Sequence, residues 1–341
     1  MKFKSIFPNS STRYFQMLTQ FIYIVTATNF WFVEDVKLPS NFLKVYNLVS
    51  KFLEVIIITF VFTGFGASYT QKNLTDKQNT DVFMKSTSSL CIYTMYGCII
   101  YKREEIKQLL FLLMVTLKEI YNDKIEKQMM MKIKIYMIGL MFFGCAAPMM
   151  SYGLEGAFHA VTSNATFTTV IPIWPDLEDR RLIAGFTRIL IYIVWLLLIA
   201  HVMAIYSLII SISICLGYQY VNLCEYFLNL HNIFDGEGSQ EDWETRYEEA
   251  VKVGIKMHVI ILRCVNQLQS SCKVVYGGQV LLNVCVMLLL LIQMMVGLIW
   301  KAIYYSSFAY PLFSYISVVR YLTIHLLYLN IIFRTVHQTF P

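Results

Sequence analysis

The sequence predicts an all-α fold, a polytopic bundle of transmembrane helices. Hydrophobic residues make up 57% of the 341 residues and charged residues only 15%, whereas a soluble domain carries about 25% charged residues. Several apolar runs reach the ~18 residues that a helix needs to cross a bilayer. A basic segment from Tyr101 to Lys134 separates two of these runs. Basic connectors of this kind stay on the cytoplasmic side. Because successive loops alternate between the two sides, this assignment also gives the side of each remaining loop.

The first apolar run, Met17 to Val33, is marginal. It is about 17 residues long and is interrupted by threonine and asparagine residues, which suits a re-entrant or interfacial helix better than a span. Whether this run crosses the membrane stays open at this point. Six full spans are expected after it, at about 45–68, 82–101, 133–151, 182–215, 274–300 and 308–333.

The loops and helix extensions follow from this topology. We expect outer loops at 69–81 and 152–181, each with one Asn-X-Thr glycosylation acceptor, at Asn73 and Asn164. A third acceptor tripeptide at Asn9 is expected on the cytoplasmic side. The helix from 182 is expected to continue through Leu230, and an amphipathic helix from Trp243 is expected to lead into the 274–300 span. The chain is therefore predicted to be a single transmembrane domain.

The sequence does not support an enzymatic, metal-binding or nucleic-acid-binding function. The sequence contains no GxSxG, HExxH, Walker or GxGxxG motif, so no enzyme is expected. The eight cysteines form no CxxC pair and no Cys/His cluster with the spacing of a zinc site. No metal or other cofactor is therefore expected. The net charge of +6 lies mostly in short cytoplasmic segments. It therefore indicates topology and not a nucleic-acid partner, and the bilayer is the expected environment.

Two groups of residues are candidates for function. Ionisable residues inside spans are the first suspects, and they are Arg188, His201, Arg320 and His325. Arg188, near an outer end, is expected to extend toward water; for Arg320, a buried interhelical contact and a water-filled path both stay open. The second group is aromatic, methionine, hydroxyl and small residues in the outer halves of the spans. Such residues suit an adaptable apolar pocket for a small volatile or lipid-like ligand, although each one alone could simply pack or face lipid. These candidates are Phe83, Met84, Thr87, Ser88, Phe143, Ala147, Met150, Tyr192, Tyr310 and Phe313.

Four segments resemble the insect odorant receptor family, and the likeness covers about Phe42 to Arg334. Lys256 to Leu262, with Leu268, Gln279 and Cys285 after it, is similar to the helix that leads into the family's fifth span. Ile171 to Asp176 resembles its proline–tryptophan–proline second outer loop. Gln219 to Leu230 resembles its cytoplasmic extension of the fourth span, and Tyr101 to Ile106 resembles the charged exit of its second span.

The resemblance implies a ligand-gated, non-selective cation channel in the plasma membrane of olfactory sensory neurons. A tuning subunit of this family binds a small volatile odorant and forms a heterotetramer with a coreceptor subunit. Its N-terminus is cytoplasmic, its odorant pocket lies in the outer halves of the second, third, fourth and sixth spans, and its seventh span lines the pore. Only six spans are expected here, so the family scheme implies a truncated gene model or a natural fragment that conducts no ions through its own subunit interface.

A G-protein-coupled receptor is the main alternative. If 17–33 crosses the membrane, the chain has seven spans and an outer N-terminus. A rhodopsin-like receptor would carry Asp-Arg-Tyr where this sequence reads Tyr101-Lys102-Arg103-Glu104, and Asn-Pro-x-x-Tyr in its last span, where Tyr328 to Ile331 differs. A transporter would favour paired broken helices in two related halves, and the sequence shows none.

Overall fold

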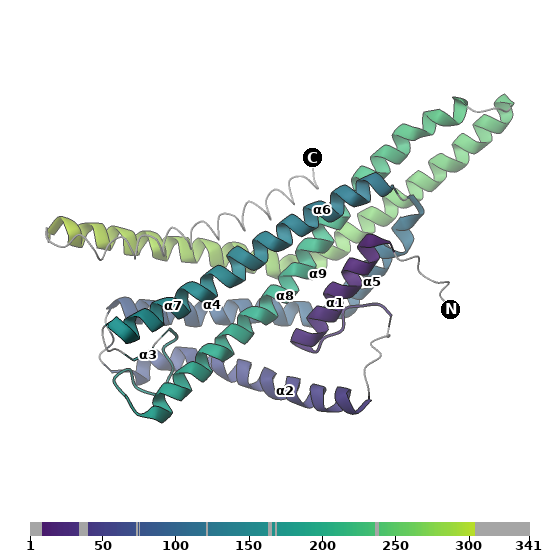
Figure 1. Cartoon of the computed structure of the whole chain (residues 1–341). Helices are drawn as coiled ribbons and strands as arrows, with labels where there is room; N and C mark the ends of the chain where they lie inside the picture. The colour runs from purple at the N-terminus through teal and green to yellow at the C-terminus, as the bar shows by residue number, and fades with distance from the viewer. Residues whose placement is uncertain are drawn as a thin grey trace.

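The computed structural model describes residues 9–33, 40–72, 74, 76–120, 122–162, 166–167, 169–235 and 239–303, which form helices and connecting loops without strands (Figure 1). The elements in chain order are α1 Ser10–Thr26, α2 Ser40–Thr63, η1 Gly64–Gly66, α3 Ala67–Thr70, α4 Asp76–Tyr101, α5 Arg103–Met114, η2 Thr116–Ile120, α6 Asp123–Gly139, η3 Leu140–Ala146, α7 Ala147–Thr162, α8 Leu182–Leu228, η4 Asn229–Asp235 and α9 Gln240–Ile303.

Three helical stretches of the described chain are long and apolar enough to cross a membrane. They are Lys44–Thr70, Asp123–Thr162 and Leu182–Asp235, and they contain the predicted spans 45–68, 133–151 and 182–215. The predicted spans 82–101 and 274–300 are helical throughout, as parts of α4 and α9, and their crossing stays a prediction. The 308–333 span lies outside the described residues.

Helix α8 is the centre of the bundle. In its most apolar stretch 61% of the residues are buried, compared with 11% and 12% in the other two apolar stretches. It contacts α1, α2, α4, α6 and α9, and Figure 1 shows it crossing the middle of the molecule. Helix α2, in contrast, exposes large apolar side chains such as Leu48, Phe52 and Phe62. In a membrane these side chains would face lipid, because the bilayer interior is as apolar as they are.

The first apolar run does not form the helix that its hydropathy predicts. Helix α1 begins at Ser10, seven residues before the expected segment, and ends at Thr26; the next residue, Ala27, has a left-handed φ of 54°. Such a residue is a common helix terminator. The predicted helix over 17–33 is therefore wrong after Thr26, where the chain continues in non-helical conformation and buries Phe30 and Trp31. Helix α1 packs against α6 and α8, so it belongs to the core of the bundle.

The basic segment packs against the bundle through two short helical elements, α5 and η2. Leu109, Leu110 and Leu113 of α5 are fully buried. Glu105 binds α9 twice: its backbone oxygen accepts a hydrogen bond from Gln267 Nε2 at 2.7 Å, and its Oε2 accepts one from Ser271 Oγ at 2.8 Å. This segment therefore connects α4 to α9.

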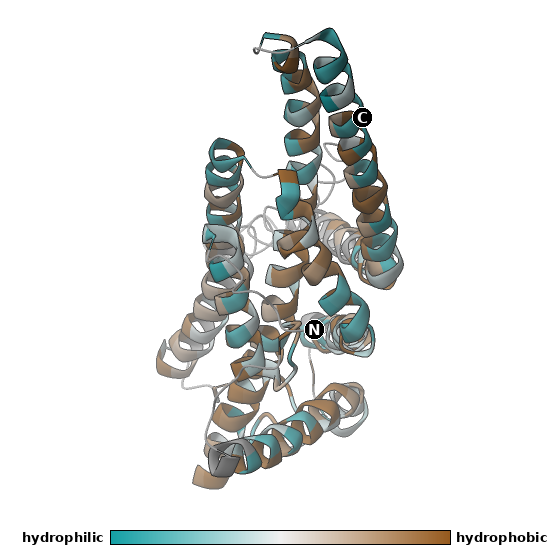
Figure 2. Ribbon diagram, turned by 90° about the vertical axis from the view of Figure 1, so that its right-hand side faces the viewer, coloured by the Kyte–Doolittle hydropathy of each residue, from teal (hydrophilic) through white to brown (hydrophobic). Residues whose placement is uncertain are grey.

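The long helical extension predicted for α8 and α9 is observed, and its cytoplasmic side stays a prediction. Helix α8 continues to Leu228, and α9 runs without a break from Gln240. A Cβ atom at Gly254 would lie 2.5 Å from Phe227 Cζ, so glycine allows the two helices to approach closely. The extension projects from the bundle in Figure 1, and hydrophilic residues surround its tip in Figure 2.

Candidate ligand site

One predicted ligand residue, Tyr192, lies where α4, α7 and α8 meet the 166–181 loop. Helix α7 is preceded by η3, a seven-residue π-helix from Leu140 to Ala146. Wide turns of this kind occur often at functional sites because they displace the register of the following helix. A Cβ at Gly144 in η3 would lie in ordinary contact with Met203 of α8, so this segment packs directly on the central helix.

Four aromatic rings gather at this position, and we call them the outer aromatic cluster: Tyr152, Phe167, Tyr192 and Trp195. The rings of Tyr192 and Trp195 stack with centroids 5.9 Å apart. The edge-to-face pairs are Tyr152 with Trp195 at 5.6 Å and Phe167 with Tyr192 at 5.8 Å. These distances lie in the favourable range for aromatic pairs. The cluster thus joins α7, α8 and the 166–181 loop through apolar, polarisable surfaces.

A glycine allows this close approach of α7 and α8. The Tyr192 hydroxyl donates a hydrogen bond to the Met149 backbone oxygen at 2.8 Å. A Cβ atom at Gly153 would lie 2.8 Å from the same hydroxyl oxygen, closer than real Cβ contacts allow. Any larger residue at position 153 would therefore displace Tyr192 from the cluster.

Two polar groups border the rings. Lys85 Nζ lies 5.1 Å from the centroid of the Tyr152 ring, within cation–π range, and donates a hydrogen bond to the Thr169 backbone oxygen at 2.7 Å. The Thr169 hydroxyl is buried and has no hydrogen-bond partner among the described residues. A buried hydroxyl without a partner is costly, and a bound ligand with one oxygen atom would relieve that cost.

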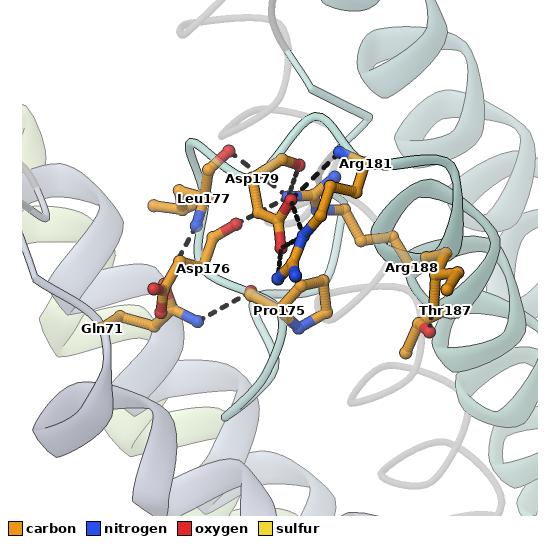
Figure 3. Close-up of polar contacts among 9 residues, drawn as sticks. Gln71, Pro175, Asp176, Leu177, Asp179, Arg181, Thr187 and Arg188 are labelled. Atoms are coloured by element: carbon orange, nitrogen blue, oxygen red, sulfur yellow. Dashed lines mark hydrogen bonds and ion pairs between the residues drawn. The ribbon is translucent and has the colours of Figure 1, made fainter.

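The 166–181 loop is held by Gln71, which is nearly fully buried. Its side-chain nitrogen donates hydrogen bonds to the backbone oxygens of Pro172 and Pro175 at 2.8 and 2.9 Å. Its side-chain oxygen accepts a hydrogen bond from Leu177 N at 3.1 Å. The nitrogen also donates to the Ile173 backbone oxygen at 3.3 Å, so one amide bonds to four backbone groups of the loop, as Figure 3 shows in part.

Arg188 holds the other side of the same loop (Figure 3). Its Nη2 donates hydrogen bonds to the backbone oxygens of Asp176 and Asp179 at 2.6 and 2.8 Å. The side chain is only 3% exposed, so the expectation that it extends toward water is wrong: loop carbonyls take the place of water.

A third contact pairs two side chains within the loop. Asp179 binds Arg181, and this pair lowers the pKa of the Asp179 carboxyl to about 2. The contact therefore contributes fully above the ordinary aspartate pKa of 3.8 and is lost only as the pH falls toward 2.

The structure places the predicted ligand residues in three groups. Tyr192 lies in the outer aromatic cluster. Met84, Ser88 and Ala147 are half-buried, and the Ser88 hydroxyl donates a hydrogen bond to the Met84 backbone oxygen of its own helix. Exposed positions are Phe83, Thr87 and Met150, with Phe83 at 57% and Met150 at 64%. The side chain of Phe143, and all of Tyr310, Phe313, Asn73 and Asn164, lie outside the described residues, so their roles stay predictions.

The ionisable residue His201 has a packing role. Its Nδ1 is hydrogen-bonded to the Leu197 backbone oxygen at 2.8 Å, and its ring meets the edge of Tyr96 at 5.9 Å. Beside it, a cavity of about 10 Å³ is lined by apolar side chains and by Tyr96 and Tyr206, enough space for about one water molecule. This part of the core is therefore close-packed. Arg320 and His325 lie outside the described residues.

Tyr192 was predicted from the sequence, but the other three rings of the cluster were not. The hydrogen bonds of Gln71 and Arg188 to the loop were not predicted either. Tyr192 and Trp195 are three residues apart, which places them on one helix face, so this pair could have been found from the sequence. Phe167, Gln71 and Thr169 gave no local signal, because their partners lie far away in the chain.

No protein-family model matches this chain, and a search of curated proteins finds no match.

Proposed function

We propose that this chain is the odorant-binding tuning subunit of a heteromeric, ligand-gated cation channel in the plasma membrane of olfactory sensory neurons, with a coreceptor subunit as partner. The observation that carries the proposal is the outer aromatic cluster, together with the nearby Thr169 hydroxyl, which has no hydrogen-bond partner among the described residues, and the 166–181 loop, which contributes Phe167 to the cluster. Three apolar helices suited to membrane crossing also support it, as does the resemblance of four separate segments to that family.

The site favours one class of ligand. Four aromatic rings offer a large apolar surface, and the Thr169 hydroxyl offers a hydrogen bond to one oxygen atom. An uncharged volatile with an apolar body and a single carbonyl or hydroxyl group matches both features. Charged ligands are disfavoured because burying an unpaired charge is very costly.

Substitutions in the cluster are expected to change odorant ranking. Trp195→Ala removes one wall and should shift half-maximal concentrations by roughly tenfold or more, unequally across a panel. Thr169→Val should raise the half-maximal concentrations of oxygen-containing odorants by roughly threefold to tenfold. It should leave those of hydrocarbons of the same shape unchanged. The measurement is odorant-evoked current in cells that express this chain with a coreceptor, normalised to surface expression. Trp174→Ala is the control, since this exposed tryptophan lies in the same loop; unchanged ranking in the first two variants would place the pocket elsewhere.

The contacts of α1 support a cytoplasmic N-terminus. Its first residues, Ser10 and Ser11, bond to Glu126 and Lys118 of the basic segment. Its last turn accepts hydrogen bonds from the Tyr46 hydroxyl, close to the beginning of α2. Helix α1 therefore begins beside the basic segment and ends beside the first residues of the next helix, which suits a helix that dips into the membrane and returns.

The side of residue 1 provides the direct test of this topology. A tag at the N-terminus is expected to be inaccessible in intact cells and accessible after permeabilisation. Asn73 and Asn164 are expected to accept glycans, while Asn9 is not, because acceptor sites are modified only on the outer side. Antibody binding to the tag on intact cells would contradict the proposal and would favour a seven-span G-protein-coupled receptor.

A further inference from the structure

A broad hollow of about 410 Å³ lies on the surface of α6, beside the first residue of α1. It combines two lysines with apolar side chains, a mixture that the odorant site does not use. The residues that line this α6 hollow are Ser10, Lys127, Met130, Met131, Lys134, Ile135 and Ile138.

The α6 hollow lies at the depth of a membrane surface. From Ile135 to Leu154 the chain contains no charged residue, and about 20 apolar residues of helix span the hydrocarbon core. Lys134 therefore sits where that core ends. Lys127 lies two turns farther from it, about 10 Å along the same helix face, which is the depth of the lipid headgroups.

Both lysines are available to an anion. The structure shows no ion pair of Lys134 with any residue that it describes. Lys127 pairs with Asp123 at 2.6 Å, but both side chains are exposed, and exposed pairs of this kind contribute little. The nearby Glu126 carboxylate is buried and faces α1 and Lys118 instead. An anionic group in the hollow would therefore meet two positive charges with little competition.

The apolar side of the hollow continues toward the membrane. Met131, Ile135 and Ile138 are all largely exposed and lie on the same side of α6 as the lysines. Exposed isoleucines are unfavourable in water but favourable beside acyl chains. The hollow therefore offers a charged end for a headgroup and an apolar end for its fatty-acid chains.

We propose that the α6 hollow binds an anionic phospholipid of the cytoplasmic leaflet. The lipid phosphate lies between Lys127 and Lys134, and the acyl chains run along Ile135 and Ile138. The proposal rests on the topology proposed above, in which the basic segment is cytoplasmic, because anionic lipids concentrate in that leaflet. Bound lipid would brace the N-terminal end of α6 beside the beginning of α1.

The test is lipid binding to the purified full-length chain in detergent, measured by native mass spectrometry. Phosphatidylserine is the probe and phosphatidylcholine the neutral reference. We expect the chain to retain phosphatidylserine preferentially. One lysine near an anionic surface raises the binding affinity about fivefold. The double variant Lys127→Gln with Lys134→Gln should therefore lower the affinity for phosphatidylserine roughly thirtyfold. Its affinity for phosphatidylcholine should stay unchanged.

The matched control removes two positive charges elsewhere. Arg246 and Lys252 are exposed residues in the first turns of α9, and Arg246→Gln with Lys252→Gln should leave binding of both lipids unchanged. Equal binding of phosphatidylserine by the wild type and the α6 variant would overturn the proposal, and so would an equal loss in the α9 variant. The measurement needs no odorant and no coreceptor, so an unresponsive channel would count against the proposed function alone.

Discussion

Replacing Glu126 with alanine is expected to lower the free energy of unfolding by about 3–5 kcal/mol, the usual cost of breaking a buried ion pair. Glu126 is 3% exposed. Its Oε2 accepts a hydrogen bond from Lys118 Nζ at 2.7 Å, and its Oε1 accepts one from Ser11 N at 2.9 Å. The carboxylate therefore balances a poorly exposed ammonium group and also lies at the N-terminus of α1, where negative charge is favoured. Its removal disturbs both contacts.

Thermal unfolding of the purified chain in detergent measures this effect. The control is Glu248→Ala, because Glu248 pairs with Lys252 at a similar distance, 2.6 Å, but on the exposed surface of α9. That change should cost at most about 0.5 kcal/mol. The double variant Lys118→Met with Glu126→Leu should recover most of the loss, since it leaves no unpaired charge behind. Equal unfolding temperatures for Glu126→Ala and Glu248→Ala would show that the buried pair does not stabilise the fold.

Gln71→Ala is expected to release the 166–181 loop. The substitution removes four hydrogen bonds and leaves the backbone oxygens of Pro172, Ile173 and Pro175 without that partner. A loss of about 2 kcal/mol in loop closure, a modest value for four bonds, would raise the open fraction roughly thirtyfold. Because Phe167 of this loop belongs to the outer aromatic cluster, odorant responses should weaken at the same time.

Trypsin cleavage after Arg180 or Arg181 reports the open loop, since both arginines are exposed at its end. The cleavage rate follows the open fraction when closing is faster than cleavage, so Gln71→Ala should be cut roughly thirtyfold faster. Tyr69→Ala is the control, because Tyr69 is 90% exposed two residues away. If both variants are cut at the wild-type rate, the Gln71 amide is not what holds the loop.

Hydropathy and charge predicted the helices well. Helix α8 begins at the predicted residue, Leu182, and continues to Leu228, two residues before the expected limit. Helix α4 ends at Tyr101 as predicted, where the basic segment begins. These features depend on local properties, namely the length of an apolar run and the charges at its ends, so the sequence alone was sufficient to predict them.

The same local properties failed at the first helix. Its apolar residues predicted a helix over 17–33, but the helix begins at Ser10 because buried polar residues complete its packing. Ser11 is fully buried and binds Glu126, 115 residues away in sequence. Hydropathy cannot detect such a residue, since a serine looks like a solvent-exposed residue until its distant partner is known.

The candidate site also combines features that the sequence predicts with features that depend on tertiary contacts. Apolar and aromatic enrichment in the predicted outer halves of the spans follows from composition, and it predicted Tyr192, which packs against Phe167 and Trp195; its role in ligand binding stays a prediction. The assembly of Tyr152, Phe167 and Trp195 around it, and the position of Gln71 under the loop, depend on which helices become neighbours. Contacts across about 100 residues form only when the whole bundle packs. Composition and hydropathy thus determine that this chain forms membrane-suited helices, while the tertiary structure alone decides which of their side chains meet.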